Sequence, residues 1–135
     1  MKGSMLLGYQ WLTGLSDTAT GVLLCVAPEF TLRLMGFHVP PDADPYVSYI
    51  GAFVLSVGLA CLYGVLLIRR RAPKSNLEVV WLLTAFSRSA VAIYVTSAVV
   101  TGTLEPGWLG VAVFDGVCVT IQAIGLRKRW LADAR

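Results

Sequence analysis

Four long apolar runs constrain the fold of this chain more than any other feature of its sequence. They cover roughly residues 5–27, 46–68, 77–101 and 108–126. A helix needs about 20 mostly apolar residues to cross the hydrocarbon core of a bilayer. Charged residues make up only 14% of the chain, against about 25% in a typical soluble domain. The pattern predicts an all-α fold, an antiparallel bundle of four transmembrane helices that forms one domain over residues 1–135.

The segments between the runs are short and contain turn residues. Residues 29–37 (EFTLRLMGF) are amphipathic and predict a short interfacial helix after the first span, which Gly36 would close. Pro73 marks the turn before the third run, where Ser75 or Asn76 would cap the helix. The turn between the last two runs is so short that these two helices must be antiparallel neighbours.

The basic residues predict the orientation of the bundle. Of the eleven Lys and Arg residues, nine lie on one side: Lys2, Arg69, Arg70, Arg71, Lys74, Arg127, Lys128, Arg129 and Arg135. The positive-inside rule therefore places both termini in the cytoplasm. The net charge of +3 then reflects topology, and no nucleic-acid partner is expected.

Three charged residues lie deep inside the apolar runs: Asp17, Arg88 and Asp115. Their positions place each of them about 16–18 Å from the inner boundary, near the midplane of a core about 30 Å thick. Charged groups inside a membrane usually face the protein interior, and one guanidinium can bind two carboxylates. We expect the three to form one cluster. Two ionised aspartates would leave one excess negative charge, which a proton or a cation would balance.

Two glutamines extend this cluster toward the cytoplasmic side. Gln10 precedes Asp17 by seven residues and Gln122 follows Asp115 by seven, so each glutamine shares a helix face with its aspartate. The matching face of the third run comprises Thr84, Ser87, Arg88, Val91 and either Tyr94 or Val95. The candidate ligand-binding residues are Gln10, Asp17, Ser87, Arg88, Tyr94, Asp115 and Gln122.

The same polar residues could instead hold the helices together. Buried polar groups bridge membrane helices, and small residues such as Gly14, Gly21, Gly51 and Gly58 let backbones approach closely. For the glutamines alone this structural interpretation is favoured. For the charged set a functional role is favoured, because well-packed apolar residues would often be at least as stable as a buried charge cluster.

The remaining residues suggest no second site. The single histidine, His38, lies in an outer loop, which excludes a bis-histidine haem inside the bundle. Cys25, Cys61 and Cys118 lie at different depths and form no C-x-x-C pair, so a disulfide relay is not expected. We predict no cofactor and no metal ligands. Aromatic residues that suit the membrane interface are Tyr9, Trp11, Tyr46, Tyr49, Trp108 and Trp130.

Three segments of the chain resemble the DoxX-like small membrane proteins. They are GLSDTATGVLLCVAPEFTLRLMGF (residues 14–37), YIGAFVLSVGLACLYGVL (residues 49–66) and FDGVCVTIQAIGL (residues 114–126). The resemblance implies a four-helix bundle in the bacterial inner (cytoplasmic) membrane, sometimes tied to quinone-linked or sulfur redox complexes. Asp17, Arg88 and Asp115 are the positions carried over. The chain lacks the C-x-x-C motif of some redox relatives, which puts a redox role in doubt.

These observations leave four functional hypotheses. The favoured one is a binding protein whose Asp–Arg–Asp site holds a lipophilic or amphipathic small molecule, such as a quinone, an isoprenoid or a lipid. An isomerase or cyclase could use Asp17 and Asp115 as a catalytic acid–base pair, so enzymatic activity is left open. The others are a proton-linked transporter and a structural subunit. The expected partners are the lipid bilayer and a lipophilic ligand, with a homo-oligomer or a membrane-complex partner as further alternatives.

Overall fold

Four long helices and one short helix make up the described part of the chain. The computed structural model describes residues 3–38 and 41–133. Its α-helices are α1 (Gly3–Val26), α2 (Pro28–Leu34), α3 (Asp44–Arg69), α4 (Lys74–Val100) and α5 (Leu109–Arg127). Single 3-10 turns cover Pro41–Ala43, Pro106–Trp108 and Trp130–Asp133. The all-α prediction and the short helix after the first long one are confirmed. Lys2 and Arg135, which contributed to the predicted basic side, lie outside the described residues.

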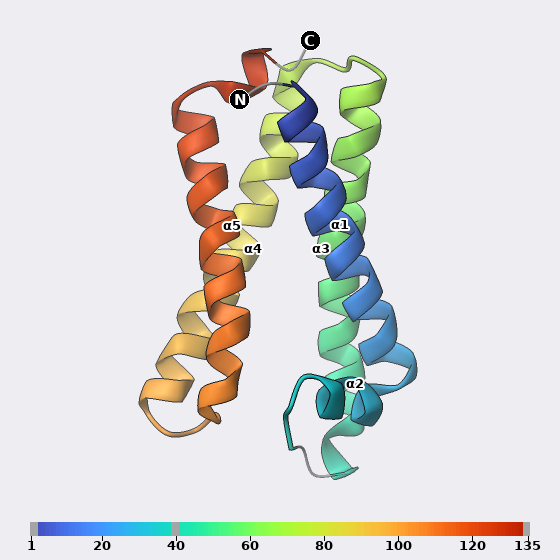
Figure 1. Cartoon of the computed structure of the whole chain (residues 1–135), viewed down its shortest axis with the longest axis vertical. Helices are drawn as coiled ribbons and strands as arrows, with labels where there is room; N and C mark the ends of the chain where they lie inside the picture. Colours follow the sequence, from blue (N-terminus) through green and yellow to red (C-terminus); the bar gives the residue numbers. More distant parts are fainter. Residues whose placement is uncertain (1–2, 39–40, 134–135) are drawn as a thin grey trace.

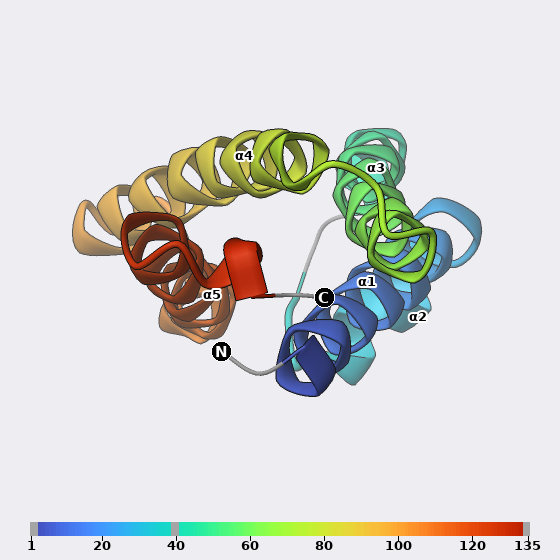
Figure 2. The ribbon, with the colours of Figure 1, turned by 90° about the horizontal axis from the view of Figure 1, so that it is seen from above.

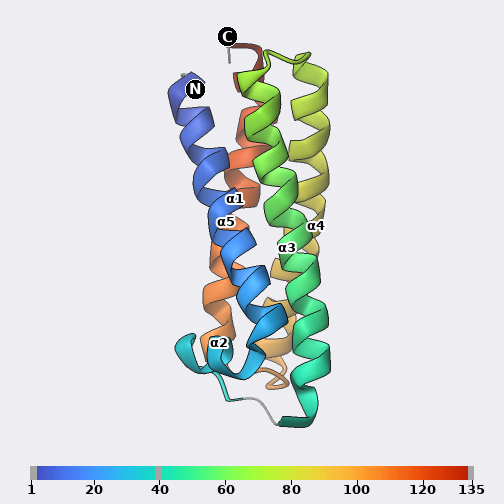
Figure 3. The same ribbon diagram turned by 90° about the vertical axis from the view of Figure 1, so that its right-hand side faces the viewer.

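The long helices run up and down and are arranged as two pairs (Figure 1). α1 packs chiefly along α3, and α5 packs chiefly along α4, while α3 and α4 join the pairs. Figure 2 shows the four helices around a common axis, and Figure 3 shows their long axes roughly aligned. The start of α1, the end of α5 and the α3–α4 turn all lie at one end of the molecule (Figure 1). We refer to this end as the basic end.

Glycines bring the backbones of α1 and α3 together. A Cβ atom on Gly21 would collide with the backbone of Leu55, and one on Gly58 would collide with the backbone nitrogen of Thr18. Small residues at such positions allow the close helix packing that is typical of membrane proteins. The α1–α3 pair therefore depends on positions where any side chain would force the helices apart.

The α3–α4 turn differs from its prediction at the start of α4. The helix begins at Lys74, and Pro73 occupies the N-cap position without a side-chain hydrogen bond. Capping by Ser75 or Asn76 was therefore wrong, since both residues already lie in the first helical turn. Arg71, just beyond the end of α3, has a φ of 51°, a left-handed conformation that terminates helices.

The bundle differs from a water-soluble one in its extensive apolar exterior and in the polar residues that it buries among apolar ones. Buried polar residues of the four long helices are Gln10, Thr13, Asp17, Thr84, Arg88, Asp115 and Gln122. The exposed large apolar side chains include Leu12, Phe53, Leu83, Ile93 and Val113. An apolar exterior of this extent marks a surface that is covered by a membrane or a partner.

Three helices are long and apolar enough to cross a membrane, namely Asp44–Arg69, Lys74–Val100 and Pro106–Arg127. By helix length and hydropathy, the chain is a multi-pass membrane protein. α1 has 24 residues and is also long enough, but it is not among the three helices selected by composition. The sequence predicted four spans, and these criteria support three of them.

Two apolar clusters pack the interior of the bundle near its ends. The cluster at the basic end contains Leu6, Leu77, Trp81 and Leu131. The cluster at the opposite end contains Leu24, Leu32, Phe37 and Val47, and it holds α2 against α1 and α3. Phe37 also stacks on Trp108, with ring centroids 4.2 Å apart. The buried charges lie between these two clusters along the helices.

Candidate functional site

Arg88 of α4 binds two aspartates from two other helices. Its Nη1 donates a hydrogen bond to Oδ1 of Asp115 on α5 at 2.5 Å, and its Nη2 donates to Oδ2 of Asp17 on α1. Both contacts are also ion pairs. The ion cluster expected from the sequence is confirmed, and we call it the triad. One guanidinium thereby connects the α1–α3 pair to the α4–α5 pair.

The helices bring the triad together because its members lie at similar heights. Asp17 and Arg88 each lie 14 residues from the first residue of their helix, Gly3 and Lys74, and Asp115 lies 12 residues before Arg127. At about 1.5 Å per residue, all three are about 18–21 Å from the basic end of the bundle. Their side chains can therefore meet at one level in the middle of the molecule.

The guanidinium is more completely enclosed than the carboxylates. The side chain of Arg88 is 3% exposed, while those of Asp17 and Asp115 are 10% and 11% exposed. The ring of Phe114 lies 5.4 Å from Cζ of Arg88 in a cation–π contact. Nε of Arg88 is buried and has no hydrogen-bond partner within the described residues. Any added group would thus reach the carboxylates more easily than the guanidinium.

The triad has a charge imbalance. Two ionised carboxylates against one guanidinium leave one negative charge, and removing an uncompensated charge from water is strongly unfavourable. A proton or a cation can restore neutrality. In the protonated form, the site would offer an O–H donor beside carboxylate oxygens that accept hydrogen bonds. The arrangement can therefore bind a proton or a polar group that donates or accepts hydrogen bonds.

Both predicted glutamines are buried, and within the part of the chain that the structure describes only Gln122 forms a side-chain hydrogen bond. Nε2 of Gln122 donates to Oγ1 of Thr84 at 2.7 Å, which links α5 to α4. Gln10 lies against Gly64 of α3, and neither its Oε1 nor its Nε2 has a partner within the described residues. Oε1 of Gln122 and Nε1 of Trp81 are likewise buried without a partner. Buried polar atoms are nearly always paired, and these four atoms can each form a further hydrogen bond.

Ser87 and Tyr94 do not join the triad. Ser87 is exposed, and its hydroxyl donates to the backbone oxygen of Leu83 at 3.1 Å. Tyr94 is 66% exposed, whereas Val95 is buried. At about 100° of rotation per residue, Ser87 points about 100° away from Arg88 and Tyr94 about 120° away. Neither Ser87 nor Tyr94 belongs to the polar face, which corrects the prediction from the sequence. The outer end of this face is occupied by Val95 instead of Tyr94.

Two aromatic residues near the site were not predicted to contribute to it. Tyr9 was expected at the membrane interface, but its hydroxyl donates a long hydrogen bond of 3.5 Å to the backbone oxygen of Cys118. Its ring also lies 5.5 Å from that of Trp81. Tyr9 lies four residues before the buried Thr13 and so near the same helix face, which could have signalled an inward orientation. The contact of Phe114 with the triad depends on how α4 and α5 cross, and no sequence pattern indicates it.

Comparison with known proteins gives no match to the chain, whether to a protein-family model, a curated protein or a solved structure. The resemblance to DoxX-like proteins therefore rests only on the three segments that suggested it. Within residues 3–38 and 41–133, no three side chains of the His, Cys, Asp and Glu types lie together as metal ligands would.

Proposed function

We propose that α1 also spans the membrane, so that the chain is a bundle of four transmembrane helices. Its 24 residues extend over about 36 Å, and it packs along α3, which is apolar enough to span. Its polar residues Gln10, Thr13 and Asp17 are buried inside the bundle. Its outward-facing side chains include Met5 and Leu12, which are 61% and 70% exposed. The outward surface of α1 is thus largely apolar, while the polar residues that keep α1 out of the three helices selected by hydropathy are buried.

We further propose that the basic end faces the cytoplasm and that the chain belongs in a bacterial inner membrane. Seven Lys and Arg residues lie at this end within the described residues: Arg69, Arg70, Arg71, Lys74, Arg127, Lys128 and Arg129. At the opposite end, Arg33 pairs with Glu29 at 2.5 Å, so its charge is locally balanced. The positive-inside rule supports this orientation.

We propose that the triad binds the polar head of a lipophilic small molecule, such as a quinone, an isoprenoid or a lipid. The observation that carries this proposal is that two carboxylates share one guanidinium in the middle of the bundle. A purely structural link between the helix pairs would need only one carboxylate. The second carboxylate adds a negative charge that destabilises the fold unless a proton or a cation neutralises it. Intramembrane ionisable groups with such a cost usually serve a function.

The triad would recognise the head group through hydrogen bonds. A proton on the aspartate pair would cancel the excess charge and donate to a carbonyl or hydroxyl oxygen of the ligand. The partial exposure of Asp17 and Asp115 supports contact through the carboxylates, while Arg88 fixes their positions. The apolar exterior would accommodate the tail. Because lipophilic ligands dissolve in the bilayer, such a site needs no aqueous path to either face.

Native mass spectrometry of the gently solubilised protein tests this proposal. We expect a defined small mass on the wild type that is lost from Asp17→Asn and Asp115→Asn. Ser87→Ala is the matched control, because Ser87 precedes Arg88 on α4 but lies on the outer surface. Circular dichroism would establish that each variant is folded. A wild type without any bound mass, or folded aspartate variants that keep it, would refute the proposal and favour a structural role for the charges.

A further inference from the structure

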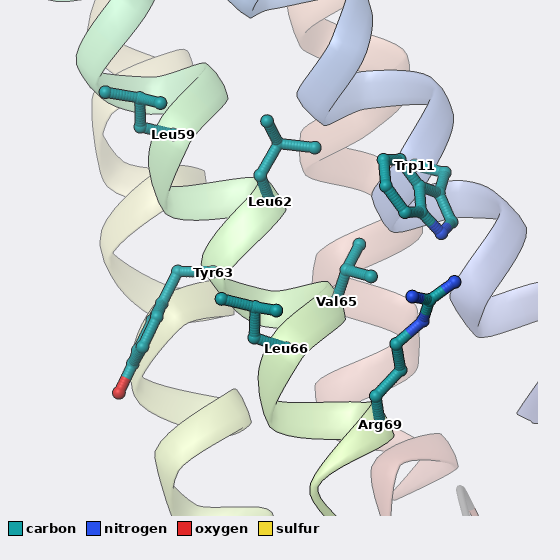
Figure 4. Close-up of a pocket in the computed structure, with 7 residues that line it drawn as sticks. All are labelled: Trp11, Leu59, Leu62, Tyr63, Val65, Leu66 and Arg69. Carbon is teal, nitrogen blue, oxygen red and sulfur yellow. The ribbon is translucent and has the colours of Figure 1, made fainter.

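A groove on the outside of the α1–α3 pair is separate from the triad. It has a volume of about 320 Å³ and lies between Trp11 of α1 and the segment of α3 from Leu59 to Arg69 (Figure 4). Its walls are apolar, and Leu59 and Leu66 are 51% and 47% exposed. The groove therefore opens to the surroundings of the bundle rather than to its interior.

The groove has a cationic end. Arg69 is the last residue of α3, and its Cζ lies 5.6 Å from the centre of the Trp11 ring. Figure 4 shows the two side chains facing each other at this end. The ion pairs found within residues 3–38 and 41–133 do not include Arg69. Its guanidinium is held in place by an aromatic ring and keeps its hydrogen-bond donors available for an anion.

The length of the groove matches one leaflet of a bilayer. The eleven residues from Leu59 to Arg69 are separated by ten rises of about 1.5 Å, or about 15 Å along the helix, which is half of a hydrocarbon core about 30 Å thick. α3 is among the helices that are apolar enough to cross a membrane. In that setting the apolar part of the groove would lie at the depth of acyl chains, and Arg69 would lie at the depth of the head groups.

We propose that this groove binds one anionic phospholipid of the leaflet at the basic end. The phosphate would bind the Arg69 guanidinium, which matches phosphate in charge and in hydrogen-bond geometry. One acyl chain would lie along Leu59, Leu62 and Leu66. The overall positive charge of the basic end further favours an anionic over a zwitterionic lipid. This site does not depend on what the triad binds.

Lipid binding to the purified full-length protein can be compared by native mass spectrometry with phosphatidylglycerol and phosphatidylcholine of identical acyl chains. We expect the wild type to prefer phosphatidylglycerol, and Arg69→Gln to bind it about fivefold more weakly, as expected for the loss of one charge at the membrane surface. Arg70→Gln is the control, because it removes the same charge from a residue outside the groove lining. It should retain most of the preference.

A second variant keeps the test decisive if Arg69→Gln proves unstable. Leu66→Trp fills the groove at a half-exposed position without changing the charge, and it should weaken the binding of phosphatidylglycerol. Equal binding of both lipids by the wild type would refute the proposal. Equal losses in Arg69→Gln and Arg70→Gln would also refute it, because they would indicate a diffuse surface charge instead of a site.

Discussion

At the residue scale, we expect replacement of Arg88 to destabilise the fold more than replacement of either aspartate of the triad. Arg88→Gln would leave two buried carboxylates without a cation and should destabilise the bundle by about 3–5 kcal/mol. Asp17→Asn or Asp115→Asn would instead leave one neutral Arg–Asp pair, and the asparagine oxygen can still accept a bond from Arg88. Each should cost less than about 1.5 kcal/mol, in the range of a single hydrogen bond. Thermal unfolding in detergent, followed by circular dichroism, measures the difference.

The double variant Asp17→Asn/Asp115→Asn provides the control for this prediction. It leaves the Arg88 guanidinium buried without a counter-charge, so it should lose far more stability than the sum of the two single variants. If either single aspartate variant were as unstable as Arg88→Gln, both carboxylates would be needed in ionised form. The idea of one excess negative charge would then be wrong.

The accuracy of the sequence analysis at this scale follows from helix geometry. The common height of Asp17, Arg88 and Asp115 along the bundle could be predicted because the rise per residue of an α-helix is nearly constant. The direction of a side chain is harder to predict. An error of one residue in the assumed helix face changes the direction by about 100°, which is the difference between Tyr94 and Val95. The orientation of Gln10 toward Gly64 depends on the distance between two helices, which no single run of sequence contains.

At the element scale, the α1–α3 contact determines which glycines can be replaced. Gly21→Ala and Gly58→Ala would each place a methyl group against the backbone of the other helix, which cannot yield as a flexible side chain can. We expect a loss of about 1–3 kcal/mol for each, as in other overpacked interiors. Gly8→Ala is the matched control on α1, because a Cβ there meets open space.

Thermal unfolding of the three variants in the same detergent distinguishes these cases. Gly8→Ala should be neutral or stabilising by up to about 1 kcal/mol, since alanine favours the helix more than glycine does. If Gly58→Ala behaved like Gly8→Ala, the close approach of α1 and α3 would be incorrect. The sequence indicated that such glycines permit close packing, but it could not say that α1 pairs with α3 and not with α5.

At the scale of the whole molecule, the exterior is apolar and the two helix pairs meet around a charged centre. The apolar exterior suits contact with lipid, and the centre of the bundle buries the charged groups that lipid could not accommodate. The four long helices could be predicted from the sequence because hydropathy and helix length are local properties, although only three of these helices are apolar enough to span a membrane by hydropathy. The pairing of the helices and the groove at Arg69 could not, because both arise from contacts between distant segments.

One labelling experiment tests both the number of transmembrane spans and the orientation of the bundle in the membrane. In a variant whose native cysteines are replaced by alanine, single cysteines can be introduced at the exposed positions Ser4, Asp42, Thr103 and Lys128. With four spans and a cytoplasmic basic end, a membrane-impermeant maleimide should label positions 42 and 103 in intact bacterial cells. Positions 4 and 128 should react only after the membrane is permeabilised.

The pattern of labelling separates the two parts of this prediction. Because α1 runs from Gly3 to Val26, positions 4 and 42 lie on opposite sides of the membrane only if α1 crosses it. Labelling of both from the same side would eliminate the α1 span while leaving the other three helices in place. Labelling of positions 4 and 128 alone in intact cells would retain four spans and reverse the orientation. In that case the positive charge of residues 69–74 and 127–129 would lie outside, against the positive-inside rule, and the lipid groove would face the outer leaflet.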